Sequence, residues 1–146
     1  MKFKLLDQRG EMKIFALVFD KNDEVQRTLL EFANDQKLAG ASVSAIGAFD
    51  GVTLGYFDRA KRDYRRIPIP EQLEVLSFAG NIARAGNDLK LHAHIVVGKA
   101  DGTAHGGHFL DGRVWPTLEM IVTETPAPLC RVHDRETGLA LINLAG

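Results

Sequence analysis

The sequence predicts an α+β fold in which one helix packs against an antiparallel β-sheet. Residues 22–38 form the one stretch with apolar residues at helical spacing. After it, the chain is a series of short apolar or alternating segments, rich in β-branched residues and separated by turn-forming pairs. Short strands joined by tight turns pair as antiparallel neighbours. We therefore expect one main helix and a sheet built largely from hairpins.

The expected helix follows a compact apolar segment at residues 12–19, MKIFALVF, which is typical of a buried strand. Asn22 or Asp23 can cap the start of the helix, and apolar residues recur at helical spacing from Val25 onward. Gly40 follows the last of these residues, where a glycine commonly ends a helix.

Turn signals divide the rest of the chain into strands. Asp50-Gly51 is a strong two-residue hairpin signal, and Asp111-Gly112 is a further turn signal. Further signals are Gly86-Asn87, Asp101-Gly102 and Thr137-Gly138. The expected strands are residues 42–49, 52–57, 64–69, 73–83, 89–97, 103–110, 114–125, 129–133 and 139–144.

Length and composition limit the classes of protein. The 146 residues contain no internal repeat or linker, which predicts a single domain over residues 1–146. No apolar run reaches the roughly 20 residues of a membrane helix, and no signal-peptide pattern opens the chain. The one cysteine, Cys130, excludes an internal disulfide and a cysteine-rich zinc site. We expect a cytoplasmic protein without membrane contact. The formal net charge of −1 shows no basic excess, so DNA binding would need a local patch or a partner.

Two histidines, His92 and His94, share one face of the expected strand 89–97. Their side chains lie about 7 Å apart along the strand, so both imidazoles can reach one ion. A three-residue loop at 100–102, with glycine last, joins this strand to the next. That loop places His94 directly opposite His108, on the same face. His105 then falls opposite Val97 and points to the other face.

In this register His92 faces Leu110, one diagonal step from His108, and Gly106 faces Val96, which leaves open space beside the three rings. Three neutral imidazoles suit zinc, and also copper, nickel or iron. Three protein ligands leave one position for water, a small ligand or a side chain from a neighbouring subunit. A polar outer sheet face would explain the histidines without a metal, but the hairpin register favours a metal site formed by His92, His94 and His108.

Three segments resemble the plants-and-prokaryotes conserved (PPC) domain family. HAHIVVGKADGTAHGGHFLDGRVWPTLEMIV is similar to its signature half, ASVSAIGAFDGVTLGYFD to the strand pair after its helix, and LEVLSFAGNIA to its central strand. The resemblance covers essentially the whole chain. It implies an α+β fold with an antiparallel sheet, a homotrimer and, as in prokaryotic members, a metal bound by histidines matching His92, His94 and His108. It also implies DNA binding, which rests mostly on plant members; the AT-hook found beside the domain in plants is absent from this sequence.

A separate segment, residues 56–66 (YFDRAKRDYRR), interleaves basic and aromatic side chains. The basic groups could contact phosphates while Tyr56 or Tyr64 stacks on a base. A solvated hairpin whose aromatic rings pack on the sheet is the simpler interpretation. The candidate DNA-binding residues are Arg59, Lys61, Arg62, Arg65 and Arg66.

Glu74 and Glu119 lie in otherwise apolar strands. Near a metal they could orient a histidine, supply a fourth ligand or act as a general base; away from it they would be exposed carboxylates or groups at a trimer interface. Three functions stay open. The first is a homotrimeric regulatory or ligand-binding protein with one zinc or other late transition-metal ion per subunit. The others are a regulator that contacts DNA or another protein, and a zinc enzyme whose zinc-bound water is the nucleophile.

Overall fold

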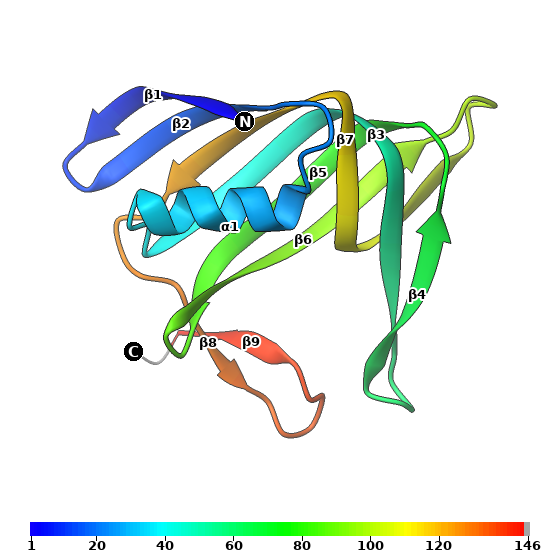
Figure 1. The fold of residues 1–146 in the computed structure, drawn as a ribbon. Coiled ribbons are helices and arrows are strands. Elements are labelled where there is room, and N and C mark those ends of the chain that lie inside the picture. The colour runs from blue at the N-terminus through cyan, green and yellow to red at the C-terminus, as the bar shows by residue number, and fades with distance from the viewer. Residues whose placement is uncertain (145–146) are drawn as a thin grey trace.

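The computed structural model describes residues 1–144 and shows a strongly bent, nine-stranded sheet with one helix lying across its inner face (Figure 1). The strands are β1 (Lys2–Arg9), β2 (Met12–Phe19), β3 (Gly40–Asp58), β4 (Asp63–Ile69), β5 (Leu73–Ala85), β6 (Asp88–Gly98), β7 (Ala104–Glu124), β8 (Cys130–His133) and β9 (Ala140–Asn143), and the helix is α1 (Val25–Asp35).

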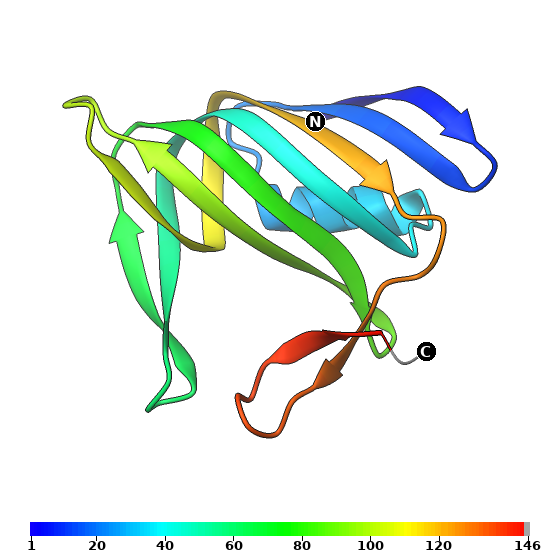
Figure 2. The same ribbon diagram turned by 180° about the vertical axis from the view of Figure 1, so that it is seen from behind.

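The sheet is organised around its two long strands, β3 and β7, which pair with each other. β3 also pairs with β5, β5 with β6, and β6 with the first part of β7, so these four strands close a ring. The β1–β2 hairpin extends from β7, and the β8–β9 hairpin extends from β5. Seen from behind, the outer face of the sheet carries no helix (Figure 2).

The core lies between α1 and the sheet and continues into the ring of strands. Phe32 of α1 contacts Phe15 of β2 edge-on, with ring centroids 5.2 Å apart. Within the ring, Phe78 and Phe109 meet in the same way at 5.0 Å. Burial of these apolar surfaces is the main stabilising contribution to such a fold. No helix within residues 1–144 is long and apolar enough to cross a membrane.

The helix starts later than expected, at Val25, and neither Asn22 nor Asp23 caps it. Glu24 does so instead, because its carboxylate accepts hydrogen bonds from the backbone N–H groups of Gln26 and Arg27 in the first turn of the helix. Asn22 adopts a positive φ of 71° in the turn that precedes the helix. The Asp23 carboxylate accepts the backbone N–H of Asp20 and so closes that turn.

The end of the helix also differs from the expectation. α1 ends at Asp35, and Lys37 takes the left-handed conformation, with a φ of 57°, that a glycine was expected to supply. The next N–H, that of Leu38, donates to the carbonyl of Ala33. Gly40 is the first residue of β3, where an added Cβ would lie 2.7 Å from the Thr125 hydroxyl oxygen.

Two of the expected hairpins do not form. Asp50-Gly51 lies inside β3 and Asp111-Gly112 inside β7, and the two pairs meet across the ladder, where Val52 pairs with Gly112. The register of β3 against β7 shifts beside Gly51, so these residues form irregularities at which both strands bend. An added Cβ on Gly112 would lie 2.9 Å from the rings of Phe49 and Phe109. The glycine therefore serves close packing instead of a turn.

One strand, β1, was not expected at all. It pairs with β2, which forms at the expected bounds. All but one of the β1 residues are exposed, so no alternation of apolar and polar side chains marks the strand in the sequence.

Candidate metal centre

The β6–β7 hairpin forms in the expected register. The Lys99 N–H donates to the Thr103 carbonyl at 2.9 Å, and Gly102 has the positive φ, 82°, that closes the three-residue loop. The ladder then pairs His94 with His108. Both side chains therefore leave the sheet on the same face, as the loop length predicted.

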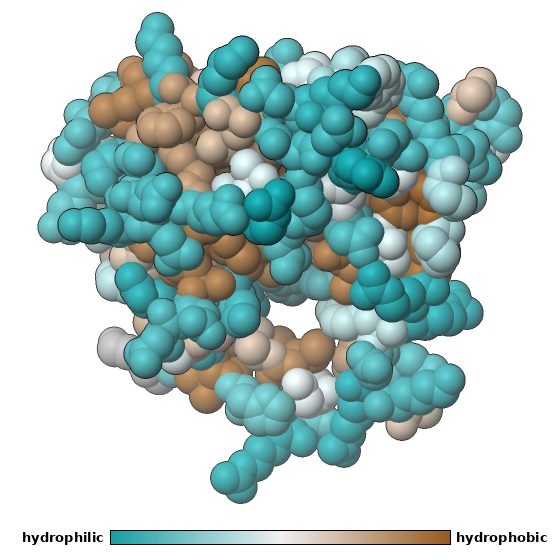
Figure 3. All heavy atoms as spheres, viewed as in Figure 1, coloured by the Kyte–Doolittle hydropathy of each residue, from teal (hydrophilic) through white to brown (hydrophobic). Residues whose placement is uncertain are grey.

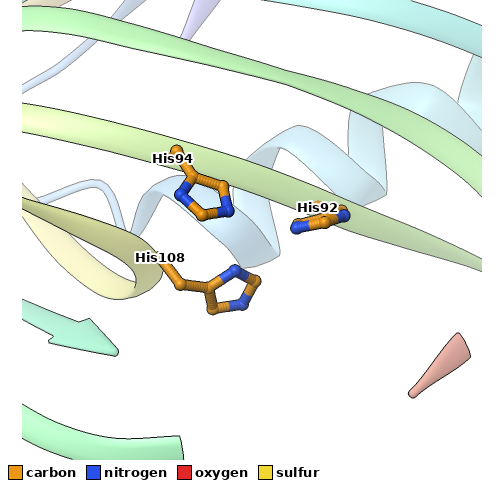
Figure 4. A group of neighbouring side chains, drawn as sticks. All are labelled: His92, His94 and His108. Atoms are coloured by element: carbon orange, nitrogen blue, oxygen red, sulfur yellow. The ribbon is translucent and has the colours of Figure 1, made fainter. Parts of the chain in front are cut away.

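The three histidines gather around one small space (Figure 4). The ring centroids of His92 and His94 are 5.4 Å apart, those of His92 and His108 5.1 Å, and those of His94 and His108 5.4 Å. One nitrogen of each ring lies within 4.8 Å of the other two, and Figure 4 shows a nitrogen of each turned toward the shared space. His105 pairs with Val97, is exposed and does not belong to this group, as expected.

One detail of the expected register is wrong. The β6–β7 ladder ends at the pair of His94 and His108. On its other side, His108 pairs with Gly55 of β3, and β7 continues along β3 from there. His92 therefore does not pair with Leu110; on the other side of β6 it pairs with Asn81 of β5. Its ring still reaches His108, since the two histidines on β6 leave the strand on the same side.

Burial favours the neutral form of two of the rings, those of His108 and His92. It lowers the pKa of His108 to about 4, and the neighbouring charges of His92, His94 and Arg131 add to the effect. Burial also lowers the pKa of His92, with smaller contributions from Arg131 and His94. Nδ1 of His108 is buried and accepts or donates no hydrogen bond within residues 1–144. A neutral ring with a free nitrogen lone pair is what a metal ligand requires, so the donor set fits a metal ion.

Tyr64 of β4 positions His108. Their rings stack with centroids 4.3 Å apart and an interplanar angle of 18°. Gly55 makes this contact possible, because an added Cβ there would lie 2.8 Å from the Tyr64 ring. Gly107 lets β7 approach β3, since its Cβ would lie 2.9 Å from the Gly55 carbonyl oxygen. Tyr64 was expected to pack on the sheet or to stack on a base, and its contact with the histidine site had no sequence signal.

Gly106 pairs with Val96, as expected from the loop. The space beside it is only partly open, because an added Cβ would lie 3.3 Å from the carbonyl oxygen of Ile95.

Arg131 of β8 is the residue that sequence reasoning missed. It is only 8% exposed. Its Nη1 donates to the Ala140 carbonyl at 2.8 Å and its Nη2 to the Asn81 side-chain oxygen at 2.5 Å. Together with His92, His108 and Tyr64 it lines one pocket. An arginine in a strand as short as β8 has no pattern that links it to histidines 23 or more residues away, and only the fold brings them together.

Glu74 and Glu119 do not belong to the histidine group. Glu74 pairs with Gly98 of β6, which lies about 13 Å along the strand from His94. Glu119 lies in the part of β7 that β3 and β5 separate from β6, about 14 Å away across the sheet. Both side chains are exposed.

The basic hairpin formed by β3 and β4 carries the five candidate DNA-binding residues, and all five are exposed. Arg66 forms an ion pair with Asp111 at 2.6 Å. The Arg65 guanidinium lies 5.4 Å from the centroid of the Tyr56 ring, which is 63% exposed. The remaining residues of the set are Arg59, Lys61 and Arg62.

Comparison with known proteins places the chain in a family. Residues 6–126 match the Plants and Prokaryotes Conserved (PCC) domain, the PPC family that the sequence resembles. The chain belongs to this family. Among curated proteins, none is significantly similar to this PCC-domain protein.

Several solved structures share the fold. A metal-containing protein from Archaeoglobus fulgidus is 31% identical, with a TM-score of 0.84 over 98% of this chain and 99% of that one. A PPC protein from Pyrococcus horikoshii is 25% identical, with a TM-score of 0.86 over 99% and 96%. A Bacteroides thetaiotaomicron protein, for which DNA binding has been suggested, is 25% identical, with a TM-score of 0.85 over 97% and 96%. The structure thus confirms a PPC-like fold with one helix and a mostly antiparallel sheet, in which only the pairing of β5 with β8 is parallel among the described strands.

Proposed function

We propose that this PCC-domain protein binds one zinc or other late transition-metal ion per subunit through His92, His94 and His108, in a regulatory or ligand-binding role. The observation that carries the proposal is the convergence of three imidazole nitrogens within 4.8 Å of one another. The buried Nδ1 of His108, which has no hydrogen-bond partner among the described residues, supports it, because burying a polar atom without a partner is costly. The likeness to the metal-containing protein from Archaeoglobus fulgidus supports it as well.

Three histidine ligands leave a coordination position for an exchangeable group. Structural zinc sites in proteins usually have four protein ligands, so an open position favours binding of a further molecule over a purely structural role. Within residues 1–144 no carboxylate joins the three rings. Because neither Glu74 nor Glu119 reaches them in this chain, no observation favours the enzyme hypothesis.

Metal analysis of the purified protein tests this proposal. We expect about one ion per subunit in the wild type, and a loss of at least about tenfold in metal affinity in His92→Ala and in His108→Ala. His105→Ala is the matched control, since it removes a histidine of the same hairpin that lies outside the cluster. A wild-type protein without stoichiometric metal, or equal metal loss in the His105 variant, would contradict the proposal.

We also propose that the protein acts as a homotrimer in the cytoplasm. The family resemblance implies the trimer, and the exposed apolar side chains on the outer sheet face support an assembly. These include Val18, Ile46 and Ile121, which are 42%, 62% and 41% exposed. Exposed apolar groups on one sheet face commonly mark a protein interface, and the exposed Glu119, which pairs with both Val18 and Ile46, would lie within it.

DNA binding is the second candidate function. Its support is the set of five exposed basic side chains on the β3–β4 hairpin, beside the exposed ring of Tyr56. If DNA is a partner, affinity for a duplex falls steeply with salt, and it falls again when Arg62, Arg65 and Arg66 are all changed to Gln.

The matched control changes three exposed basic residues of β1, Lys2, Lys4 and Arg9, to Gln. Fluorescence anisotropy at several salt concentrations provides the measurement. A response to salt that is flat, or an equal loss in both triple variants, would remove DNA binding by this hairpin.

A further inference from the structure

We infer that the open metal position faces a receptor for a small carboxylate, in which one carboxylate oxygen binds the metal and the other accepts a hydrogen bond from Arg131. This inference rests on the proposed metal site and adds the class of ligand to it. Arg131 lies outside residues 6–126, the part of the chain that matches the family.

Two of the three histidines, His92 and His108, line a pocket of about 150 Å³. The β6–β7 hairpin provides His92 and His108, β4 provides Tyr64, and the β8–β9 hairpin provides Arg131. In Figure 1 the β3–β4 and β8–β9 hairpins project from the same side of the sheet, and Figure 3 shows the surface hollowed between them. An added Cβ on Gly138 would lie 3.9 Å from Cβ of Arg62, so the two hairpins also meet near their tips.

The charges around this pocket favour an anion. Neutral imidazoles leave the two positive charges of a divalent ion uncompensated, and no Asp or Glu among residues 1–144 lines the pocket. Arg131 and Lys90, which both line it, add further positive charge. A ligand that brings a negative charge into contact with the metal and Arg131 therefore gains most from the site.

The Arg131 side chain is held in place by hydrogen bonds. The Ala140 carbonyl and the Asn81 side chain hold its two terminal nitrogens, which fixes the plane of the guanidinium. Its Nε is buried and has no hydrogen-bond partner within the described part of the chain. Buried donors in native proteins are rarely left unpaired, so this group points to an acceptor that arrives with a ligand.

The small volume and the mostly apolar lining of the pocket favour some anions over others. The remaining lining residues are Leu91, Leu139, Ala140 and Leu141, all apolar. A carboxylate has two oxygens, one for the metal and one for Arg131, and a short aliphatic remainder suits these walls. A phosphate has further charged oxygens, for which the pocket supplies only Lys90 as an additional cation. The site therefore fits a short-chain carboxylic acid.

Calorimetric titration of zinc-loaded protein tests the inference with propionate as the probe, propionamide as its neutral isostere and inorganic phosphate as the competing anion. We expect propionate to bind about 10- to 100-fold more tightly than propionamide, and more tightly than phosphate. Arg131→Gln lowers propionate affinity by a similar factor, and Arg131→Lys by less. Arg135→Gln is the matched control, because it removes one exposed positive charge from the same hairpin.

The metal content of every sample is measured first, which separates the two proposals. Wild-type protein that holds no metal overturns both. Stoichiometric metal with equal affinity for propionate and propionamide overturns the carboxylate receptor alone, and so does propionate binding that Arg131→Gln leaves unchanged. Tighter binding of phosphate than of propionate overturns the carboxylate as the ligand class. If Arg131→Gln does not fold, the comparison of the three probes on the wild type still decides.

Discussion

His108 is fixed by more contacts than a strand position alone would give it. The hairpin ladder places it opposite His94, Tyr64 stacks on its ring, and its Nδ1 is buried without a partner in the described chain. Each contact limits the orientation of the ring, so a bound ion would meet a ligand that is already positioned. The same burial makes a charged His108 unfavourable, which couples the site to pH.

We predict that the metal-free protein loses stability as the pH falls from 6.5 toward 4. The pKa of His108 drops from 6.5 to about 4 on folding, so in this window the unfolded chain binds a proton that the folded protein does not. The contribution of His108 to the free energy of unfolding is therefore fully present above the unfolded pKa and declines as the pH falls. Because the ring is partly exposed, we expect a loss of about 1–3 kcal/mol.

Urea unfolding in the presence of EDTA at pH 4.5, 5.5 and 7 measures this loss. In His108→Gln the dependence on pH should be clearly weaker, because the titrating group is gone while a side chain of related shape stays. The raised pKa of the N-terminal amine acts near pH 8, outside this window. Equal slopes in the variant and the wild type would contradict the assignment to His108.

Single residues also show what the sequence can reveal about the site. The choice of His108 over His105 followed from one loop, because register in a short hairpin depends only on local turn geometry. Tyr64 and Arg131 could not be found in the same way. Their contacts with the histidines depend on how β4 and β8 are arranged around the ring of strands, and no local pattern contains that information.

At the scale of elements, β2 and β6 were predicted well, whereas β1 was missed and each of the two long strands was predicted as two shorter ones. β2 forms at residues 12–19 as expected, and β6 differs from the expected strand by one residue at each end. By contrast, Asp50-Gly51 and Asp111-Gly112 have the composition of hairpin turns but lie within β3 and β7. Glycine permits both a tight turn and a bent strand. The pairing of β3 with β7 decides between them, and it joins residues about 60 positions apart.

The bends in β3 and β7 have a consequence for the metal centre. They change the direction of β7, so that its first part pairs with β6 while its second part pairs with β2. Without this change of partner, the His108 end of β7 could not lie beside both His94 of β6 and Gly55 of β3. The departures from the predicted hairpins and the formation of the histidine site therefore have the same structural origin.

At the scale of the whole molecule, the two faces of the sheet differ in how far they are covered. α1 covers the inner face, whereas the outer face exposes the side chains of Val18, Ile46, Leu76, Val96 and Ile121. Strand pairing links this apolar face to the metal centre, because Ile121 pairs with Ser44, Ser44 with Ala79, and Ala79 with His94. A partner that covered the apolar face would therefore lie next to the histidines.

The proposed homotrimer gives this face a direct test. We expect light scattering coupled to size-exclusion chromatography to give about three times the chain mass of 16.1 kDa for the wild type. Ile46→Asp should shift the mass toward that of a monomer, because an unpaired charge buried in an interface costs on the order of 3 kcal/mol or more per copy. Val132→Asp is the control, since Val132 is 55% exposed and its side chain leaves β8 on the face opposite to that of Arg131, which lines the histidine pocket. A monomeric wild type would contradict the trimer. An Ile46→Asp protein that keeps the wild-type mass would place the interface elsewhere, and the apolar face would then need another partner.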